Sequence, residues 1–191
     1  MKPILFNTDM VRALLGGRKT VTRRVIDRDI VNRFDMESDG TVISYEDPGT
    51  GDHYEPTAVC RYQPGDVLYV RETWAEMPYG IVYRADDERP EGWDCDDRWK
   101  PSIHMPGELA RLFLRVKSVR IQRLNDMTEE DAMAEGFPDA PAGEDSPLER
   151  FAQLWDKTIK RGERAAFGWY GNPYVWVIEF EKISRKEALE E

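Results

Sequence analysis

The sequence predicts a mainly β protein of the α+β class, a small closed or partly closed barrel with short peripheral helices. Strand-like segments outnumber helical segments, and the helical ones are short. The chain also lacks a βαβ rhythm, a glycine-rich dinucleotide fingerprint and a P-loop. These observations argue against a helical bundle and against a doubly wound nucleotide-binding sheet.

Length and composition predict a single domain, 1–191, with an ordinary hydrophobic core. The chain has 191 residues, of which 40% are hydrophobic. No apolar run approaches the roughly 20 residues of a membrane span, and the apolar start is too short for a signal peptide. We therefore expect a cytoplasmic protein with no membrane partner. Cys60 and Cys95 are expected to be reduced thiols, and no ligand spacing predicts a metal site.

Charge is distributed unevenly along the chain. The net charge is −10, which excludes a broad basic field for non-specific duplex binding. Residues 1–34, however, contain eight Lys and Arg against three Asp, a local charge of +5. A small basic pocket on an acidic protein suits a compact polar or anionic ligand, or a short single strand.

The N-terminal third predicts a strand, a helix, a second strand and an insertion. Residues 1–7 predict a strand, and residues 8–15 a helix with Thr8 as its cap and Gly16 or Gly17 at its end. Residues 19–25 alternate as a strand does. The turn-rich segment 27–62 predicts a loop or β-insertion with short hairpin strands such as 41–45.

The middle of the chain predicts further strands. Residues 67–74 and 81–84 have strand character, and an acidic loop follows over 86–98. Prolines at both ends exclude a helix over 99–106, which we expect to pack against the barrel. Residues 109–124 predict the longest strand, with a bulge near Ser118 where the alternation changes phase.

The C-terminal third predicts two capped helices and a central strand. The first helix, within 127–137, has Thr128 as its cap and Asp131 three residues later. The second spans 146–159, begins at a Ser-Pro pair and stops by Gly162. Residues 174–180 are apolar at almost every position and predict a central strand, and the charged tail 181–191 is expected to be frayed or helical.

The segment from Gly16 to Arg24 carries the strongest functional signal. It joins two glycines to four cations interleaved with two threonines. In a strand, Thr20 and Thr22 share one face, and Lys19 lies on the other with Arg23. Such a turn and strand can hold an anion or activate an oxygen nucleophile. The alternative is a solvated basic edge that protects the sheet from aggregation.

Several motifs, taken together and in order, resemble ASCH domains of the phage and bacterial type, which have a PUA-like fold. The first is Gly17-x-Lys19-x-x-Thr22-x-Arg24. The matches cover nearly the whole chain apart from the 27–62 insertion and the tail. The others are Pro64-Gly65-Asp66-x-Leu68-x-Val70-Arg71-Glu72-x-Trp74, the segment 100–106, the segment 129–136 and Asn172-Pro173-x-Val175-Trp176-Val177.

The resemblance implies a PUA-like β-barrel with a cleft beside the helix and the basic strand. The family is associated with RNA binding, and one branch consists of amidohydrolases that remove the acyl group from N4-acylcytidines. In that branch a Lys, a Thr and a Glu act together, and the matching positions are Lys19, Thr22 and Glu135. Thr22 stands where the wider family usually has Glu, which points to the hydrolase branch. This chain is much longer than those minimal enzymes.

The chemistry of these three residues is coherent without a metal or other cofactor. A threonine hydroxyl needs a base, and a lysine can serve when burial or nearby cations lower its pKa. Glu135 would orient the ammonium or shuttle a proton, and the Gly16 and Gly17 amides would hold the oxyanion. In an ideal strand, however, Lys19 and Thr22 face opposite ways, so Thr20 is a rival nucleophile. The bland alternative is an ordinary buried ion pair.

Further residues are candidates for substrate or RNA binding. Two other functions remain open: a non-catalytic module that binds single-stranded RNA through basic residues and stacked aromatics, and a ribonuclease that pairs His104 with Lys19. The expected partner is thus a nucleoside or single-stranded RNA. The candidate binding residues are Arg18, Thr20, Arg23, Arg24, Arg71, Glu72, Trp74 and His104.

Overall fold

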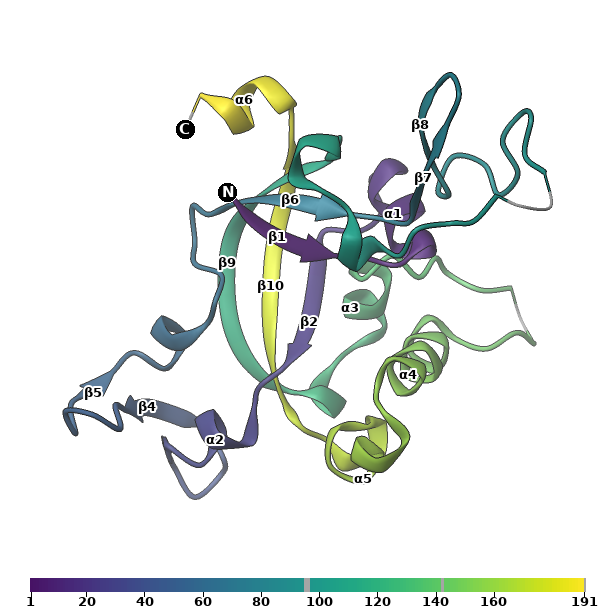
Figure 1. The fold of residues 1–191 in the computed structure, drawn as a ribbon. Coiled ribbons are helices and arrows are strands. Elements are labelled where there is room, and N and C mark those ends of the chain that lie inside the picture. Colours follow the sequence, from purple (N-terminus) through teal and green to yellow (C-terminus); the bar gives the residue numbers. More distant parts are fainter. Residues whose placement is uncertain (95–96, 142, 191) are drawn as a thin grey trace.

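A single curved five-stranded sheet forms the centre of the molecule (Figure 1). The computed structural model describes residues 1–94, 97–141 and 143–190, and Cys95 lies outside them. Strand β1 pairs in parallel with β6, and the other neighbours are antiparallel. The order across the sheet is β1 (Lys2–Leu5), β6 (Val67–Arg71), β9 (Phe113–Arg123), β10 (Tyr174–Ile183) and β2 (Val21–Val25).

The mixed α+β class is confirmed, but the main sheet is open rather than closed. Strands β1 and β2 are its two edges, and no backbone ladder joins them within the described ranges. One side chain does connect these edges: Arg24 on β2 donates from Nη2 to the carbonyl oxygen of Leu5 on β1, at 2.9 Å. The strand pairing of the described residues therefore does not confirm the closed PUA-like barrel that the resemblance implies.

Strand β10 is central, as its continuous apolar sequence predicted. Val175, Val177 and Ile178 are fully buried, because both faces of the strand are covered. The register shift between Glu179 and Phe180 leaves one extra residue on β9 next to Ser118, which confirms the predicted bulge. The strand also runs on to Ile183, so the charged tail begins later than expected.

The tail itself is helical. Helix α6 (Arg185–Leu189) begins at Ser184, whose hydroxyl accepts from the Glu187 amide in a capping box. Ala188 on this helix is buried in a small apolar cluster with Val67, Trp74 and Phe113, and this packing anchors the end of the chain. Cys60 is a free, buried thiol, and burial raises its pKa.

The N-terminal elements differ from the prediction at their boundaries. Helix α1 (Thr8–Leu15) is capped by Asn7, whose Oδ1 accepts from the Met10 amide at 2.8 Å, and not by Thr8. The helix ends at Gly16 and Gly17, the latter with φ +70°. Strand β2 begins at Val21, two residues later than predicted, because the preceding backbone bonds to neighbouring helices.

The predicted strand 67–74 is in fact two strands. β6 stops at Arg71, and β7 (Trp74–Met77) pairs with β8 (Gly80–Tyr83) in a separate two-stranded sheet. The chain turns away here because the Trp74 backbone pairs with Lys100 instead of continuing along the main sheet. The proline-flanked segment is not helical apart from a 3-10 turn at Ser102–His104, and it packs less closely than expected: Met105 is buried, but Ile103 and His104 are exposed.

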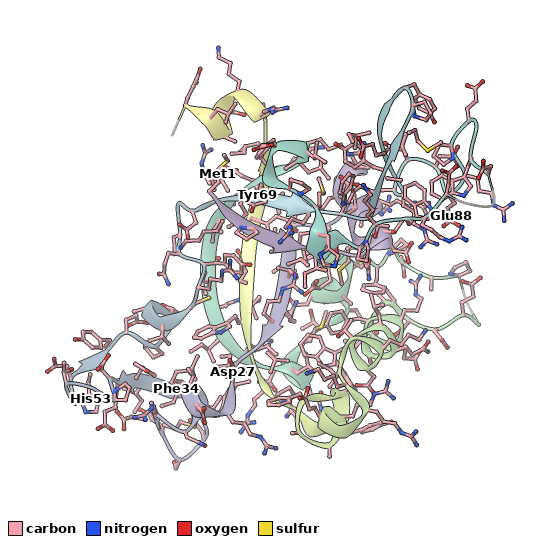
Figure 2. All side chains as sticks on the ribbon, viewed as in Figure 1. Met1, Asp27, Phe34, His53, Tyr69 and Glu88 are labelled. Atoms are coloured by element: carbon pink, nitrogen blue, oxygen red, sulfur yellow. The ribbon has the colours of Figure 1, made fainter. Side chains whose placement is uncertain are left out.

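The 27–62 insertion forms its own small sheet, with helix α2 (Arg28–Val31) before it. Figure 2 shows Phe34 and His53 on this part, on the far side of the main sheet from Glu88. The Tyr174 hydroxyl donates to the Gly40 carbonyl at 2.7 Å and ties the insertion to β10. The strands are β3 (Phe34–Met36), β4 (Val42–Glu46) and β5 (His53–Tyr54).

Three helices cover the β2 side of the main sheet (Figure 1). Helices α3 (Glu129–Ala134) and α4 (Pro147–Thr158) both begin with the predicted capping boxes. Helix α4 ends at Thr158, before Gly162, and α5 (Arg164–Phe167) follows. Phe151 of α4 packs with Val21 and Val177 of the sheet in one apolar cluster. None of the helices in the described ranges is long and apolar enough to cross a membrane.

Candidate functional site

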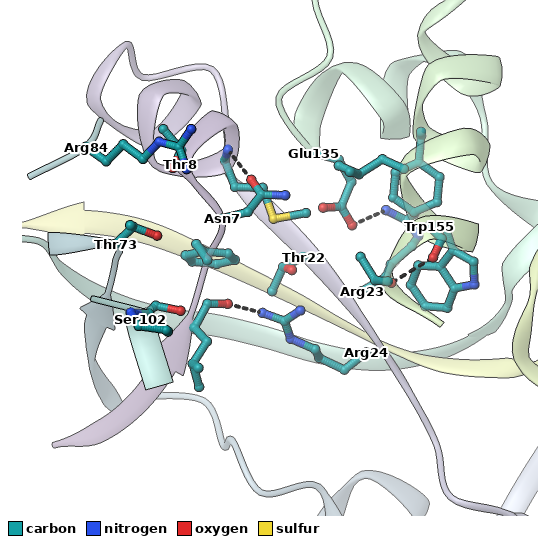
Figure 3. A pocket seen from close by; sticks show the side chains of 17 residues that line it. Asn7, Thr8, Thr22, Arg23, Arg24, Thr73, Arg84, Ser102, Glu135 and Trp155 are labelled. Carbon is teal, nitrogen blue, oxygen red and sulfur yellow. Dashed lines mark hydrogen bonds and ion pairs between the residues drawn. The ribbon is translucent and has the colours of Figure 1, made fainter. Parts of the chain in front are cut away.

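A cavity of about 450 Å³ lies beside strand β2, in the region that the basic segment predicted. Figure 3 shows Thr22 near its centre, Glu135 and Trp155 on one side, and Thr73 and Ser102 on the other. The walls come from the start of α1, β2, α4 and the loops after β6 and β8. The lining includes Phe6, Asn7, Thr8, Thr22, Arg23, Arg24, Thr73, Arg84, Ser102, Glu135, Phe151, Leu154 and Trp155.

A buried ion pair between Lys19 and Glu135 lies next to this cavity. The Lys19 ammonium donates to Glu135 Oε2 at 2.5 Å, to the Glu135 carbonyl at 2.9 Å and to the Val21 carbonyl at 2.9 Å. The two side chains are 0% and 1% exposed. The Val21 carbonyl belongs to the peptide unit that precedes Thr22, so the ammonium lies beside the backbone of the proposed nucleophile.

Two local features bring these side chains together. Glu135 is the C-cap of α3, directly after Ala134, and Gly136 after it has φ +108°, which favours glycine. A Cβ at Gly136 would lie 2.6 Å from the Ala13 Cβ, so only glycine allows α1 and α3 to meet here. Lys19 precedes the strand, because its amide bonds to the Ala13 carbonyl. Lys19 thus lies outside the regular strand, and it lines a different hollow from Thr22.

Arg23 extends the ion pair into a network. Its guanidinium lies 3.4 Å from Glu135 Oε1 and 3.0 Å from Asp131 Oδ2, and its side chain is 0% exposed. It also donates to Gln122 Oε1 at 3.2 Å. Arg23, although predicted to bind substrate, thus neutralises two carboxylates.

Burial governs the titration of the cations in this region. Burial lowers the pKa of Lys19, the Glu135 carboxylate opposes this shift, and Arg24 and Arg23 add to it by repulsion. Burial likewise lowers the pKa of Arg24, against the attraction of Glu135. A lysine with a lowered pKa releases its proton more readily and can act as a base.

Thr22 is the hydroxyl that the cavity presents beside this network. The residue is only 1% exposed, and within the described part of the chain its hydroxyl has no hydrogen-bond partner. Thr20 is exposed and lines a different hollow with Gly17 and Lys117. That second hollow also contains Lys19, so Thr20 stays a rival nucleophile on the Lys19 side, whereas Thr22 lines the cavity with Glu135.

The predicted oxyanion hole at Gly16 and Gly17 is wrong. The amides of Gly16 and Gly17 bond to the carbonyls of Arg12 and Leu14 and complete the end of α1. Arg24 is the better-placed donor, because it lines the cavity and gives one hydrogen bond to Leu5, with its remaining N–H groups available.

The other predicted binding residues do not line the cavity. Arg18 is exposed, and His104 is exposed on its 3-10 helix. Arg71 donates to the carbonyls of Ile103 and Met105, so it holds the loop instead of a ligand.

Glu72 and Trp74 have structural roles of the same kind. Glu72 is 1% exposed and accepts two hydrogen bonds from Arg111, at 2.9 and 3.0 Å. Trp74 is buried in the small apolar cluster that also holds Ala188. The Lys100 ammonium lies over its ring, 4.4 Å from the centroid. Neither residue lines the cavity, whereas Thr73 between them does.

Sequence reasoning missed much of the lining. Thr8, Thr73, Arg84 and Ser102 come from four separate segments that only the fold brings together. Trp155 lies on the apolar face of α4, and that face also forms a wall of the cavity. Among the described residues, no group of three or more His, Cys, Asp or Glu side chains is placed to bind a metal ion.

Comparison with known proteins adds little to this picture. No family model matches the sequence, and no curated protein matches it. A solved structure that aligns with it is protein EF3133 from Enterococcus faecalis V583, described as DUF984. It is 13% identical, with 96% of this chain and 82% of that chain covered and a TM-score of 0.45. We draw no conclusion about fold or function from a likeness of this size.

Proposed function

We propose that the protein is an ASCH-type amidohydrolase that removes the acyl group from N4-acylcytidine, with Thr22 as nucleophile. The observation that carries this proposal is the Thr22 hydroxyl, which lines a cavity together with Glu135, the partner of the buried Lys19 ammonium. The Lys19 ammonium donates to the carbonyl of Val21, the residue before Thr22, and a lysine with a lowered pKa can serve as the base that a threonine nucleophile needs.

The reaction divides into two steps. In the first, Thr22 Oγ1 attacks the acyl carbon while its proton passes to the neutral amine of Lys19. The carbon–N4 bond then breaks, N4 receives that proton, and the cytosine amine leaves. In the second, water attacks the acyl-threonine, the carboxylic acid departs and the Thr22 hydroxyl is restored. Glu135 holds the Lys19 amine in place and stabilises its charged form.

The rest of the cavity suits this substrate. Arg24 offers N–H groups to the oxyanion that forms on the acyl oxygen. Phe151 and Trp155 form an aromatic wall, with ring centroids 5.8 Å apart, and Leu154 lies beside them. Such a wall accepts an apolar acyl group or one face of a pyrimidine.

The two alternatives find less support in the arrangement. An RNA-binding module would need exposed cations along the basic segment, yet the side chains of Lys19 and Arg23 are 0% exposed and paired. A ribonuclease would need His104 near Lys19, but His104 is exposed elsewhere and does not line the cavity.

The test is the release of cytidine from N4-acetylcytidine, followed by ultraviolet absorbance and confirmed by chromatography. Thr22→Ala is expected to lower kcat by at least about 100-fold, whereas Thr22→Ser keeps a measurable fraction of it. Thr20→Ala, in the same segment but outside the cavity, is expected to retain activity. Absence of cytidine release at high enzyme concentration would refute the proposal, and loss of activity in Thr20→Ala alone would assign the nucleophile to Thr20.

A further inference from the structure

One end of the cavity is polar and lies away from the aromatic wall. It is formed by the three hydroxyl residues Thr8, Thr73 and Ser102 together with Arg84, here called the polar end. Figure 3 shows these four residues on the side opposite Trp155, with Thr22 between the two. None of them has a role in the hydrolysis proposed above.

The fold holds Arg84 at this place. Its amide donates to the Thr73 carbonyl at 3.0 Å, which fixes the base of the β7–β8 hairpin. Arg12 on α1 donates to the carbonyls of Ala85 and Arg84, at 3.1 and 3.3 Å. The backbone that carries Arg84 is therefore clamped to α1 from one side and to Thr73 from the other.

The guanidinium of Arg84 nevertheless retains unused donors. Its Nε is buried and has no hydrogen-bond partner within the described ranges. Within the described ranges, its one ion pair is with the exposed Glu88, at 4.0 Å, a separation too long for a hydrogen bond. A buried donor without a partner costs free energy, so a ligand acceptor that reaches it is favoured.

We propose that the polar end binds the phosphate of a nucleotide, so that the substrate is an acylated cytidine monophosphate and not the free nucleoside. This inference rests on the proposed function, since it places the pyrimidine at Thr22. A guanidinium and three hydroxyls supply donors that match the three acceptor oxygens of a phosphate monoester. The N4 amide and the ribose lie on opposite edges of cytosine, so a sugar phosphate extends away from the acyl group.

A mononucleotide fits the observations better than RNA. The cavity of about 450 Å³ is in the range of small-molecule sites. The protein carries a net charge of −10, and a long polyanion would meet repulsion that a single phosphate near Arg84 avoids.

Binding of unmodified cytidine and cytidine 5′-monophosphate tests the inference by calorimetry, because these compounds need no catalysis. The wild-type protein is expected to bind the monophosphate about tenfold more tightly than cytidine. Arg84→Ala removes this preference, and Arg84→Lys, which keeps the charge, retains part of it. Arg33→Ala, which removes an exposed arginine on the insertion, keeps the full preference. Melting curves confirm that each variant is folded.

A substitution at Glu88 provides a second test, in which binding of the monophosphate should become tighter instead of weaker. Glu88→Gln removes the exposed carboxylate that lies 4.0 Å from Arg84. It is expected to tighten binding of the monophosphate by about two- to threefold and leave cytidine binding unchanged.

Equal affinity of the wild-type protein for both compounds, or failure to bind either at millimolar concentration, would overturn the inference. So would a full preference in folded Arg84→Ala, or a short RNA that binds more tightly than the monophosphate. The hydrolase proposal fails separately: preference for the monophosphate without any release of cytidine leaves the phosphate site standing. Equal kcat/KM for N4-acetylcytidine and its 5′-monophosphate would refute the proposed phosphate site and leave the hydrolase proposal intact.

Discussion

Glu135→Gln tests whether the negative charge of Glu135 stabilises the folded protein by neutralising the buried Lys19 and Arg23 cations. The Glu135 carboxylate faces Lys19 at 2.5 Å and Arg23 at 3.4 Å, and all three side chains are at most 1% exposed. Glutamine has nearly the same shape and keeps an acceptor oxygen, so the substitution removes mainly the charge. Two buried cations then remain, with Asp131 at 3.0 Å from Arg23 as the nearest remaining anion.

The expected loss follows from this geometry. Removal of one partner from a buried pair typically costs about 3–5 kcal/mol. Arg23 keeps Asp131, so we expect the lower limit, about 3 kcal/mol, in the free energy of unfolding. For a domain of this size that corresponds to a fall of about 6–12 °C in Tm. Lys19→Met costs less, because Glu135 retains Arg23, and the double variant loses less than the sum of the two.

Urea denaturation at pH 7, followed by circular dichroism, gives the free energies, and melting curves give Tm. Glu130→Gln is the matched control, since it removes the same charge from an exposed position on the same helix. Unchanged m-values would show that the denatured state is not altered. A Tm for Glu135→Gln within about 2 °C of the control would refute the reasoning, because a buried uncompensated charge lowers the free energy of unfolding by more than such a shift allows.

Three further outcomes follow. The lowered pKa of Lys19 means that the folded state binds fewer protons than the unfolded state, whose lysine titrates near 10.5. Wild-type stability should therefore rise relative to Lys19→Met as pH increases towards 10.5, by at most about 1.4 kcal/mol per pH unit, and a parallel pair of stability–pH curves would contradict this. Gly136→Ala should cost about 2–4 kcal/mol in urea denaturation, from backbone strain plus a clash, whereas Gly65→Ala, at φ +90° in open space, costs only the strain. Arg111→Met should cost about 3 kcal/mol by leaving the Glu72 carboxylate buried without its bidentate partner, and a loss below about 1 kcal/mol would show that water or another group replaces it.

Local signals in the sequence were accurate wherever the physics is local. The capping boxes at Thr128 and Ser146 satisfy free backbone amides within one turn, and both are present as predicted. The bulge near Ser118 follows from a change of phase within one strand, and the centrality of β10 follows from apolar residues on both of its faces.

Predictions failed where a distant partner competes for the backbone. Strand 67–74 ends early because Trp74 pairs with Lys100, and β2 starts late because Thr20 donates to the Ala134 carbonyl. Spacing along the chain carries no information on such contacts.

The sequence by itself predicted, through motif order and resemblance, that Lys19, Thr22 and Glu135 act together, and it determined that a basic segment lies on an acidic protein. The tertiary structure decided that the Lys19 ammonium is buried against Glu135, and that Thr22, not Thr20, opens into the cavity. It also placed Arg84 opposite the aromatic wall. Burial and charge pairing depend on which segments meet across the fold, and those contacts set the chemistry that residue type alone leaves open.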